Sequence, residues 1–173
     1  MALPKTINDR QWQSYRVAGT NLTALATDTG APQAVFSQKL ETATITWAAL
    51  TTGAIGSHPL ATVTGVVGVS LFAKVLTDAT SGGAATIEVG TAVSTPGLIA
   101  LTTFDKLDAN ELWHDASPDA SIELDSVLTK KIVSQSIAVK ITDATITGGT
   151  IVFYLSWYPI SSDGNVVMVT PFA

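Results

Sequence analysis

Apolar and polar residues alternate with a period of two along most of this chain, and helical periodicity is nearly absent. Such alternation is typical of β-strands with one buried face. In the strand around Ala85–Thr91, for example, Ile87 and Val89 are expected to point inward and Glu88 outward. In the run Ile132–Ile141, Lys140 is expected to face outward. The clearest runs are Glu41–Ala49, Val63–Val75, Ala85–Thr91 and Ile132–Ile141.

Turn-forming residues separate these runs and complete a pattern of many short strands. Gly65 and Gly68 are expected to bend or bulge the strand that contains them. Eight or more strands at this spacing predict an all-β fold, a β-sandwich or jelly roll, over residues 31–173. The less regular residues 1–30 predict an N-terminal arm, irregular or with a short helix. The expected turns are Ser81-Gly82-Gly83, Pro96-Gly97, Gly148-Gly149 and Asp163-Gly164.

One strand near the end of the chain, within Thr147–Ser161, is apolar on both faces. Its odd-numbered residues from Ile151 to Trp157 suit the interior of a sandwich. The opposite face carries Val152, Tyr154 and Tyr158, whose hydroxyls can find partners, and this face predicts a subunit interface. The alternative is that the arm folds back over this face, with Trp12 and Tyr15 as its contacts.

The composition also favours an oligomer. Only 13% of the residues are charged, against about 25% in an average soluble protein, and the mean hydropathy is +0.36. Large exposed apolar patches are rare on monomers, so part of this surface is expected to lie against other subunits. The richest apolar run, Val63–Leu76, contains Lys74 and is too short to span a membrane.

Charge and cysteine content exclude several further classes. The net charge is −5 and the isoelectric point is about 4.7, whereas a nucleic-acid-binding protein needs a basic face to neutralise phosphates. Cysteine is absent, so neither a disulfide framework nor a thiolate metal site is expected. The first residues lack the apolar core of a signal peptide, and synthesis and assembly in a cytoplasm is the simplest interpretation.

No constellation of residues predicts an enzyme, a metal site or a cofactor. Asp28-Thr29-Gly30-Ala31 is similar to the catalytic loop of aspartic proteases, but the polar Thr27 precedes it and an ordinary turn explains it better. Half of the acids lie in Asp105–Asp125 without a calcium-loop spacing, which favours a solvated loop. His58 and His114 are too few for a histidine-based zinc site and are expected in loops.

Aromatic residues leave one binding function open. Trp113, Trp157, Tyr154 and Tyr158 have the chemistry to stack on sugar rings, as in carbohydrate-binding modules. On a long central strand, alternating aromatics are more often core and interface residues. A carbohydrate- or receptor-binding module therefore stays the alternative.

Two segments of the chain, Asp78–Asp125 and Ser136–Ile160, resemble a group of virion proteins of tailed bacteriophages. The shared order is a glycine-rich turn, a strand ending in VGTA, a loop with ANELW, and a hairpin into GGT followed by apolar and aromatic residues and Tyr-Pro. The resemblance covers roughly the C-terminal half to two-thirds of the chain. The N-terminal part carries no feature of the group.

The resemblance implies a structural role without an active site. Members decorate or cement the capsid, or form head fibres and spikes, often as trimers of β-sandwich or jelly-roll subunits. It therefore implies self-association into a homo-oligomer, most simply a homotrimer, contact with the major capsid protein or other virion proteins, and location in the virion after assembly in the bacterial cytoplasm. An arm with Trp12, Tyr15 and Arg16 is expected to dock on the capsid or on a neighbour. No catalytic residue, cofactor, metal, nucleic acid or membrane is implied.

Overall fold

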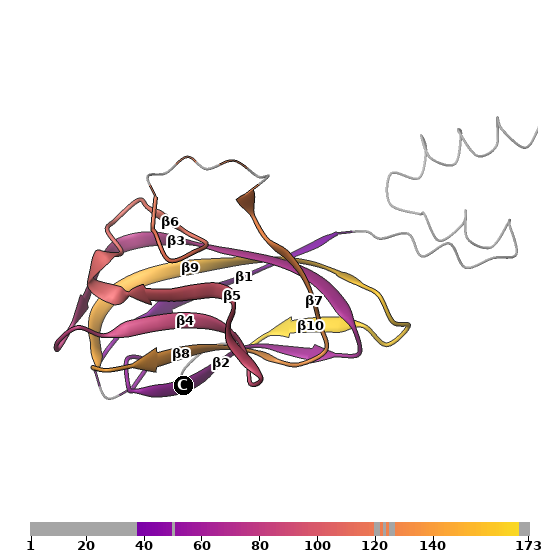
Figure 1. Cartoon of the computed structure of the whole chain (residues 1–173), viewed down its shortest axis with the longest axis horizontal. Coiled ribbons are helices and arrows are strands. Elements are labelled where there is room, and N and C mark those ends of the chain that lie inside the picture. Colours follow the sequence, from indigo (N-terminus) through magenta and orange to yellow (C-terminus); the bar gives the residue numbers. More distant parts are fainter. Residues whose placement is uncertain (1–37, 50, 120–121, 123, 125–126, 170–173) are drawn as a thin grey trace, which may run out of the picture. The chain divides into compact units, whose positions relative to one another are not determined.

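A computed structural model of the chain describes residues 38–49, 51–119, 122, 124 and 127–169. These residues belong to a compact unit, Gln38–Ala173, in which two antiparallel five-stranded sheets pack face to face (Figure 1). The short 3₁₀ helix η1 spans Phe104–Lys106, and the described residues contain no α-helix. The prediction of an all-β sandwich is confirmed.

The first sheet, called sheet A, has β9 at its centre. Its strand order is β1-β9-β3-β6, and β7 also pairs with β3. All of these pairings are antiparallel. The bounds are β1 (Lys39–Thr46), β3 (Val67–Ser81), β6 (Leu112–Trp113), β7 (Lys130–Val133) and β9 (Ile146–Pro159).

The second sheet, called sheet B, has the strand order β10-β2-β8-β4-β5. Consecutive strands of the chain mostly lie in opposite sheets, since β1, β3 and β9 belong to sheet A and β2, β4, β8 and β10 to sheet B. This wrapping of one chain around both layers supports the jelly-roll interpretation. The bounds are β2 (Gly56–Thr64), β4 (Thr86–Thr91), β5 (Ser94–Thr103), β8 (Ile137–Thr142) and β10 (Asn165–Met168).

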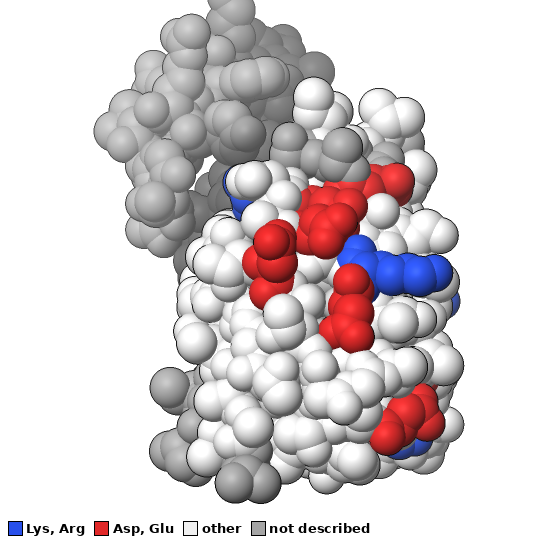
Figure 2. Space-filling view, turned by 90° about the vertical axis from the view of Figure 1, so that its left-hand side faces the viewer, with Lys and Arg blue, Asp and Glu red and all other residues white. Residues whose placement is uncertain are grey.

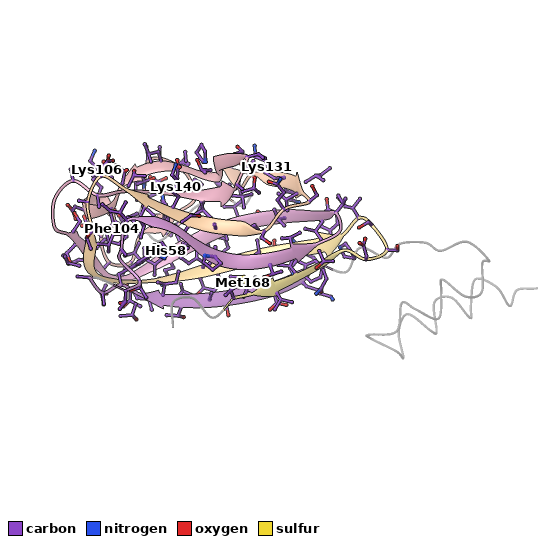
Figure 3. The ribbon with its side chains drawn as sticks, turned by 90° about the horizontal axis from the view of Figure 1, so that it is seen from below. His58, Phe104, Lys106, Lys131, Lys140 and Met168 are labelled. Carbon is purple, nitrogen blue, oxygen red and sulfur yellow. The ribbon has the colours of Figure 1, made fainter. Side chains whose placement is uncertain are left out.

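The core lies between the two sheets and is almost wholly aliphatic and aromatic. At the end that carries η1, Phe104 is buried and meets Trp47 edge-on, with ring centroids 5.7 Å apart. Phe104 and Lys106 lie at this same end, on the left of Figure 3. Trp113 is also fully buried, and its Nε1 donates a hydrogen bond of 2.9 Å to Thr102 Oγ1. The inward positions expected for Ile45, Trp47, Ile87 and Val89 are confirmed.

Two of the expected strands are each divided between the sheets. Val63–Val75 is not one strand, because the chain leaves sheet B after Thr64 and enters sheet A at Val67. Gly65 makes this corner with a φ of +63°, a conformation that L side chains rarely adopt. Its bend is therefore confirmed, whereas Gly68 lies at an unbulged position of β3.

The expected strand Ile132–Ile141 is divided in the same way. β7 pairs with β3 in sheet A, and β8 pairs with β2 and β4 in sheet B. The break is at Ser134-Gln135-Ser136, where the chain crosses from one layer to the other. Period-two alternation continues across this crossing, and so it gave no sign of the change of sheet.

Two of the expected turns lie inside strands. Pro96-Gly97 falls within β5, and the β4–β5 turn is at Ala92-Val93 instead. Gly148-Gly149 falls within β9, where the pairing with β3 shifts register and Gly149 has a φ of +116°. The glycines thus mark an irregularity of the strand rather than its end. The turns at Gly82-Gly83 and Asp163-Gly164 are confirmed.

Glu88 faces away from the core, as expected, but it is not solvated. It is 6% exposed and lies opposite Lys140 in the pairing of β4 with β8. Its Oε1 is 3.5 Å from Lys140 Nζ, and the lysine side chain is 40% exposed. A buried carboxylate needs such a partner, because transfer of an unpaired charge from water is costly.

Candidate interface on the outer face of sheet A

β9 is central in sheet A and exposes only one of its two faces. Every odd-numbered side chain from Ile151 to Trp157 is at most 1% exposed, which confirms the expected inner face. Val152, Tyr154 and Tyr158 are half-buried on the opposite side. Here the outer face of sheet A means the side chains that the register places on that side: Leu40, Thr42, Thr44, Thr46, Ser70, Phe72, Lys74, Leu76, Leu112, Lys130, Ile132, Val152, Tyr154, Ser156 and Tyr158.

An aromatic pair occupies the middle of the outer face. Phe72 on β3 is the register partner of Tyr154 on β9. The two rings are stacked, with centroids 4.9 Å apart and an interplanar angle of 10°. On the other side of Tyr154, the register partner on β1 is Thr42, which is exposed. Tyr154 is therefore covered on one flank by its own sheet and stays accessible on the other.

Tyr158 lies across a glycine of the neighbouring strand. A Cβ atom at Gly68 would come within 2.2 Å of Tyr158 Cζ and 2.6 Å of its hydroxyl oxygen. The absence of a side chain at Gly68 thus leaves room for the phenol ring against the β3 backbone. The chain itself covers part of the second face of β9, and half-buried aromatic surface remains.

Three aliphatic side chains on the outer face are strongly exposed. Leu40 on β1 is 63% exposed, Leu76 on β3 is 46% exposed, and Ile132 on β7 is 71% exposed. Together with the Phe72–Tyr154 pair they make an apolar surface that crosses four strands of one sheet. Exposed apolar surface of this kind is typical of a protein contact site.

The strand residues of the outer face carry only positive charge, Lys74 and Lys130. This contrasts with the net charge of −5 for the chain. Figure 2 looks onto the end of the sandwich that carries η1, and acidic side chains gather there. The structure thus separates an acidic end from an apolar, weakly basic sheet face.

The acidic stretch that begins at Asp105 forms hydrogen bonds within the chain. Asp105 Oδ2 accepts one from Ser81 Oγ at 2.8 Å, and Asp115 Oδ1 accepts one from the Ser117 N–H at 2.7 Å. Glu111 Oε2 accepts another from the Asp108 N–H at 2.9 Å. Over the part of the chain that the structure describes, no three His, Cys, Asp or Glu side chains are grouped so that they hold a metal ion.

The two histidines have separate surroundings, and one expectation about them is wrong. His58 is not in a loop but in β2, where its Nε2 lies 2.7 Å from the Ala54 carbonyl oxygen. The His114 side chain is 6% exposed, and its ring nitrogens each lie 3.8 Å from a carboxylate oxygen, of Asp115 and of Asp119. His114 therefore lies close to two carboxylates of its own loop.

Two of the four aromatic residues considered for sugar stacking, Trp113 and Trp157, are buried and cannot contact a sugar ring. Trp113 and Trp157 are at most 1% exposed, and Lys39 Nζ lies 4.6 Å from the centroid of the Trp157 ring. Their place in the core leaves Tyr154 and Tyr158 as the only members of that set with accessible surface.

A surface groove was missed by sequence reasoning, because residues far apart in the chain form it. It has a volume of about 380 Å³ and lies between the β4–β5 turn and β7. Its most exposed apolar residue is Val93, at 81%. Its lining residues are Thr91, Val93, Ser94, Gly97, Leu98, Lys131, Ile132, Val133, Ser134 and Gln135.

Several expectations concern residues outside the described part of the chain. The docking residues Trp12, Tyr15 and Arg16, the turn at Asp28, and the boundary expected between residues 30 and 31 all belong to this group. Among the residues that are described, no helix has the length and apolarity needed to cross a membrane.

Comparisons with known proteins return two solved structures. No protein-family model and no curated protein matches the sequence. An acidic stable capsid structure of Helicobacter pylori bacteriophage KHP30 is similar over 78% of this chain and 95% of that one, with 13% identity and a TM-score of 0.44. A cyanophage Pam1 capsid asymmetric unit is similar over 71% and 85%, with 16% identity and a TM-score of 0.38. Both are phage capsid structures.

Proposed function

We propose that this chain is a non-enzymatic structural protein of a bacteriophage virion. In this proposal it is a subunit of an oligomeric capsid decoration, cement or head-spike protein, assembled in the host cytoplasm and located in the virion. The supporting sequence observation is the resemblance over Asp78–Asp125 and Ser136–Ile160. The supporting structural observation, on which the proposal depends most, is the apolar outer face of sheet A.

The outer face of sheet A is the surface that we assign to subunit contacts. The inner face of the sheet already fills the core, so the residues on its outer face are not needed to close the sandwich. Val152, Tyr154 and Tyr158 would lie at the centre of the contact, because aromatic residues are enriched and most charges are depleted in interface cores. The homotrimer in this proposal follows from the resemblance to virion proteins that are often trimers.

The solution mass of the protein, with and without purified capsid shells, tests this proposal. We expect the parent protein to be an oligomer that sediments with the shells. Val152→Lys places a charge in the centre of the proposed contact without removing the Phe72–Tyr154 stack, and we expect it to lower the mass to that of a monomer. Light scattering measures the mass, and circular dichroism checks that the strand content is unchanged.

The matched control is Thr62→Lys, which adds the same charge at an exposed position of β2 in sheet B. We expect this variant to keep the mass of the parent. A parent protein that is monomeric at all concentrations and does not sediment with shells contradicts the proposal. An oligomer that is equally insensitive to both substitutions contradicts the assignment of the interface to this face.

The N-terminal arm is proposed as a second contact, to the major capsid protein, another virion protein or a neighbouring subunit. The motivation is the group of Trp12, Tyr15 and Arg16 in a segment otherwise poor in large side chains. Deletion of Met1–Gly19 should weaken sedimentation with shells, and a triple alanine variant at the three residues should reproduce the effect. Unchanged shell binding by both variants would eliminate this role.

The alternative, a carbohydrate- or receptor-binding β-sandwich module of a tail fibre, depends on fewer residues than the sequence predicts. Burial of Trp113 and Trp157 leaves only tyrosines for stacking on a sugar ring. A glycan panel with tyrosine fluorescence as the signal distinguishes the two functions. A change that is abolished by Tyr158→Ala supports the alternative, and no change across the panel supports the structural role.

A further inference from the structure

β1 is an edge strand with one side paired and the other side open. All eight of its residues, Lys39–Thr46, pair with β9 without a register shift. Within the described residues no strand pairs with its opposite side. An edge strand presents unpaired N–H and C=O groups, and proteins usually protect it with proline, bulges or many charges. β1 has no proline and no bulge, and its charged residues are Lys39 and Glu41.

The alternation of hydrogen bonds between β1 and β9 shows which residues of β1 direct their backbone N–H and C=O groups away from β9. The Trp47 N–H donates to the Gly149 carbonyl at 2.9 Å, and this pair continues the register of β1 with β9. Hydrogen-bonded and non-hydrogen-bonded pairs alternate in antiparallel sheets. Odd-numbered residues of β1 therefore bond to β9, and the even-numbered residues from Leu40 to Thr46 direct their N–H and C=O groups to the open edge.

We propose that the first part of this open edge, residues 38–42, pairs antiparallel with the same residues of a second copy of the chain, about a twofold axis at Leu40. In this register Leu40 faces Leu40 of the second copy. Lys39 of each copy faces Glu41 of the other copy, so two such pairs form. Opposite charges directly across an antiparallel pair stabilise it. The 63% exposure of Leu40 gives the apolar contact at the axis.

Other registers of the same two strands pair their charged residues less well. A shift by one residue of the axis, to Glu41, sets the two Glu41 carboxylates against each other, and like charges directly opposite destabilise a sheet. An axis at Thr42 sets Lys39 opposite Ile45 and Glu41 opposite Ala43. Only the axis at Leu40 pairs both charges of the strand with their opposites.

The proposed pairing joins two copies of sheet A into one continuous sheet. Leu40 is the register partner of Ser156, so it lies on the same outer face as Tyr154 and Tyr158. The twofold contact uses Leu40 at the margin of that face and leaves its centre, Val152, Tyr154 and Tyr158, to the contact proposed above. An assembly that uses both contacts is larger than one held by either contact alone.

Cysteine substitution tests the pairing directly, because the chain contains no cysteine of its own. Residues opposite each other in a hydrogen-bonded pair have Cα atoms about 5.5 Å apart, within the range that a disulfide bridges. Leu40→Cys should therefore give a covalent dimer in air, seen on a non-reducing gel. The control Thr44→Cys, on the same strand and face but away from the axis, should stay largely monomeric on that gel.

Charge reversal tests the register. Lys39→Glu and Glu41→Lys should each weaken the pairing, because each sets like charges opposite one another. The solution mass of the assembly should then fall by a factor of about two. The double variant restores opposite charges and should restore the mass. Val152→Lys should leave the Leu40→Cys crosslink intact, which separates this contact from the one on the outer face.

Three outcomes would overturn the inference. One is an equal yield of dimer from Leu40→Cys and Thr44→Cys. Another is a double charge variant no more associated than the single variants. The third is a mass that none of the β1 substitutions changes.

Discussion

Phe72 and Tyr154 are stacked on the outer face of sheet A, with their ring centroids 4.9 Å apart. They are direct register partners on β3 and β9, so the pair spans the two longest strands of the fold. An aromatic pair of this kind stabilises the sheet and also presents a flat, half-buried surface to a neighbour. In the proposed subunit contact, stability and association depend on the same two rings, so the two properties have to be measured separately.

Loss of the Tyr154 ring should destabilise the isolated subunit. We expect Tyr154→Ala to lower the free energy of unfolding by about 1 kcal/mol or more, because the stack and its buried area are both removed. Tyr154→Phe keeps the ring and should cost little. Urea denaturation at a concentration where the protein is monomeric measures both values. Equal stability of the two variants would show that the stack contributes nothing to the fold.

The contact between Gly68 and Tyr158 predicts a non-additive pair of substitutions. Gly68→Ala brings a methyl group to 2.2 Å from Tyr158 Cζ, so the ring has to move away from the strand. In a Tyr158→Ala background the same methyl group has free space, and the cost should largely disappear. The four unfolding free energies of this double-mutant cycle provide the check. Additive values would mean that Tyr158 does not pack on Gly68.

Thr102 should be needed for the burial of Trp113. Its Oγ1 accepts the Trp113 Nε1 hydrogen bond at 2.9 Å, and the indole is fully buried. Thr102→Val keeps the shape but leaves a buried donor unpaired, which costs about 1–3 kcal/mol. The control Thr62→Val, at an exposed position of β2, should be close to neutral. Thermal unfolding that is identical for the two variants would refute this role.

The buried Glu88 should make Lys140 important for stability. The carboxylate is 6% exposed, and its Oε1 lies 3.5 Å from Lys140 Nζ. Lys140→Met removes the cation and leaves the buried charge behind, so we expect a loss of at least about 1 kcal/mol. In a Glu88→Gln background the loss should be smaller, because no charge is left to compensate. Chemical denaturation of the four proteins measures the coupling, and a coupling of zero would contradict the prediction.

Period-two alternation was sufficient to predict the fold class and the inner faces of the strands. Ile45, Trp47 and the odd-numbered residues of β9 are buried as expected, because alternation reports directly on which side of a strand meets the core. It does not report which sheet the strand joins. The chain changes sheet at Gly65 and again at residues 134–136 while apolar residues continue to alternate, so the pattern predicts one strand at each place where the structure has two.

Burial of long polar and aromatic side chains was harder to predict. Glu88 alternates correctly with Ile87 and Val89, yet its burial depends on β8, about fifty residues away in the sequence, and on Lys140 there. Trp113 lies in an acidic stretch, and its place in the core follows from the pairing of β6 with β3 and from Thr102 on β5. Such contacts arise from the tertiary fold, and no local pattern contains them.

The central position of β9 determines how the outer face of sheet A resists a pulling force. Both edges of this strand are bonded along most of its length, to β1 and to β3. A pull applied through Tyr154 in the strand direction is therefore resisted by two ladders loaded in parallel, whose bonds have to shear together. Because the chain passes to sheet B at each end of β9, the same load is shared with the second layer through covalent links.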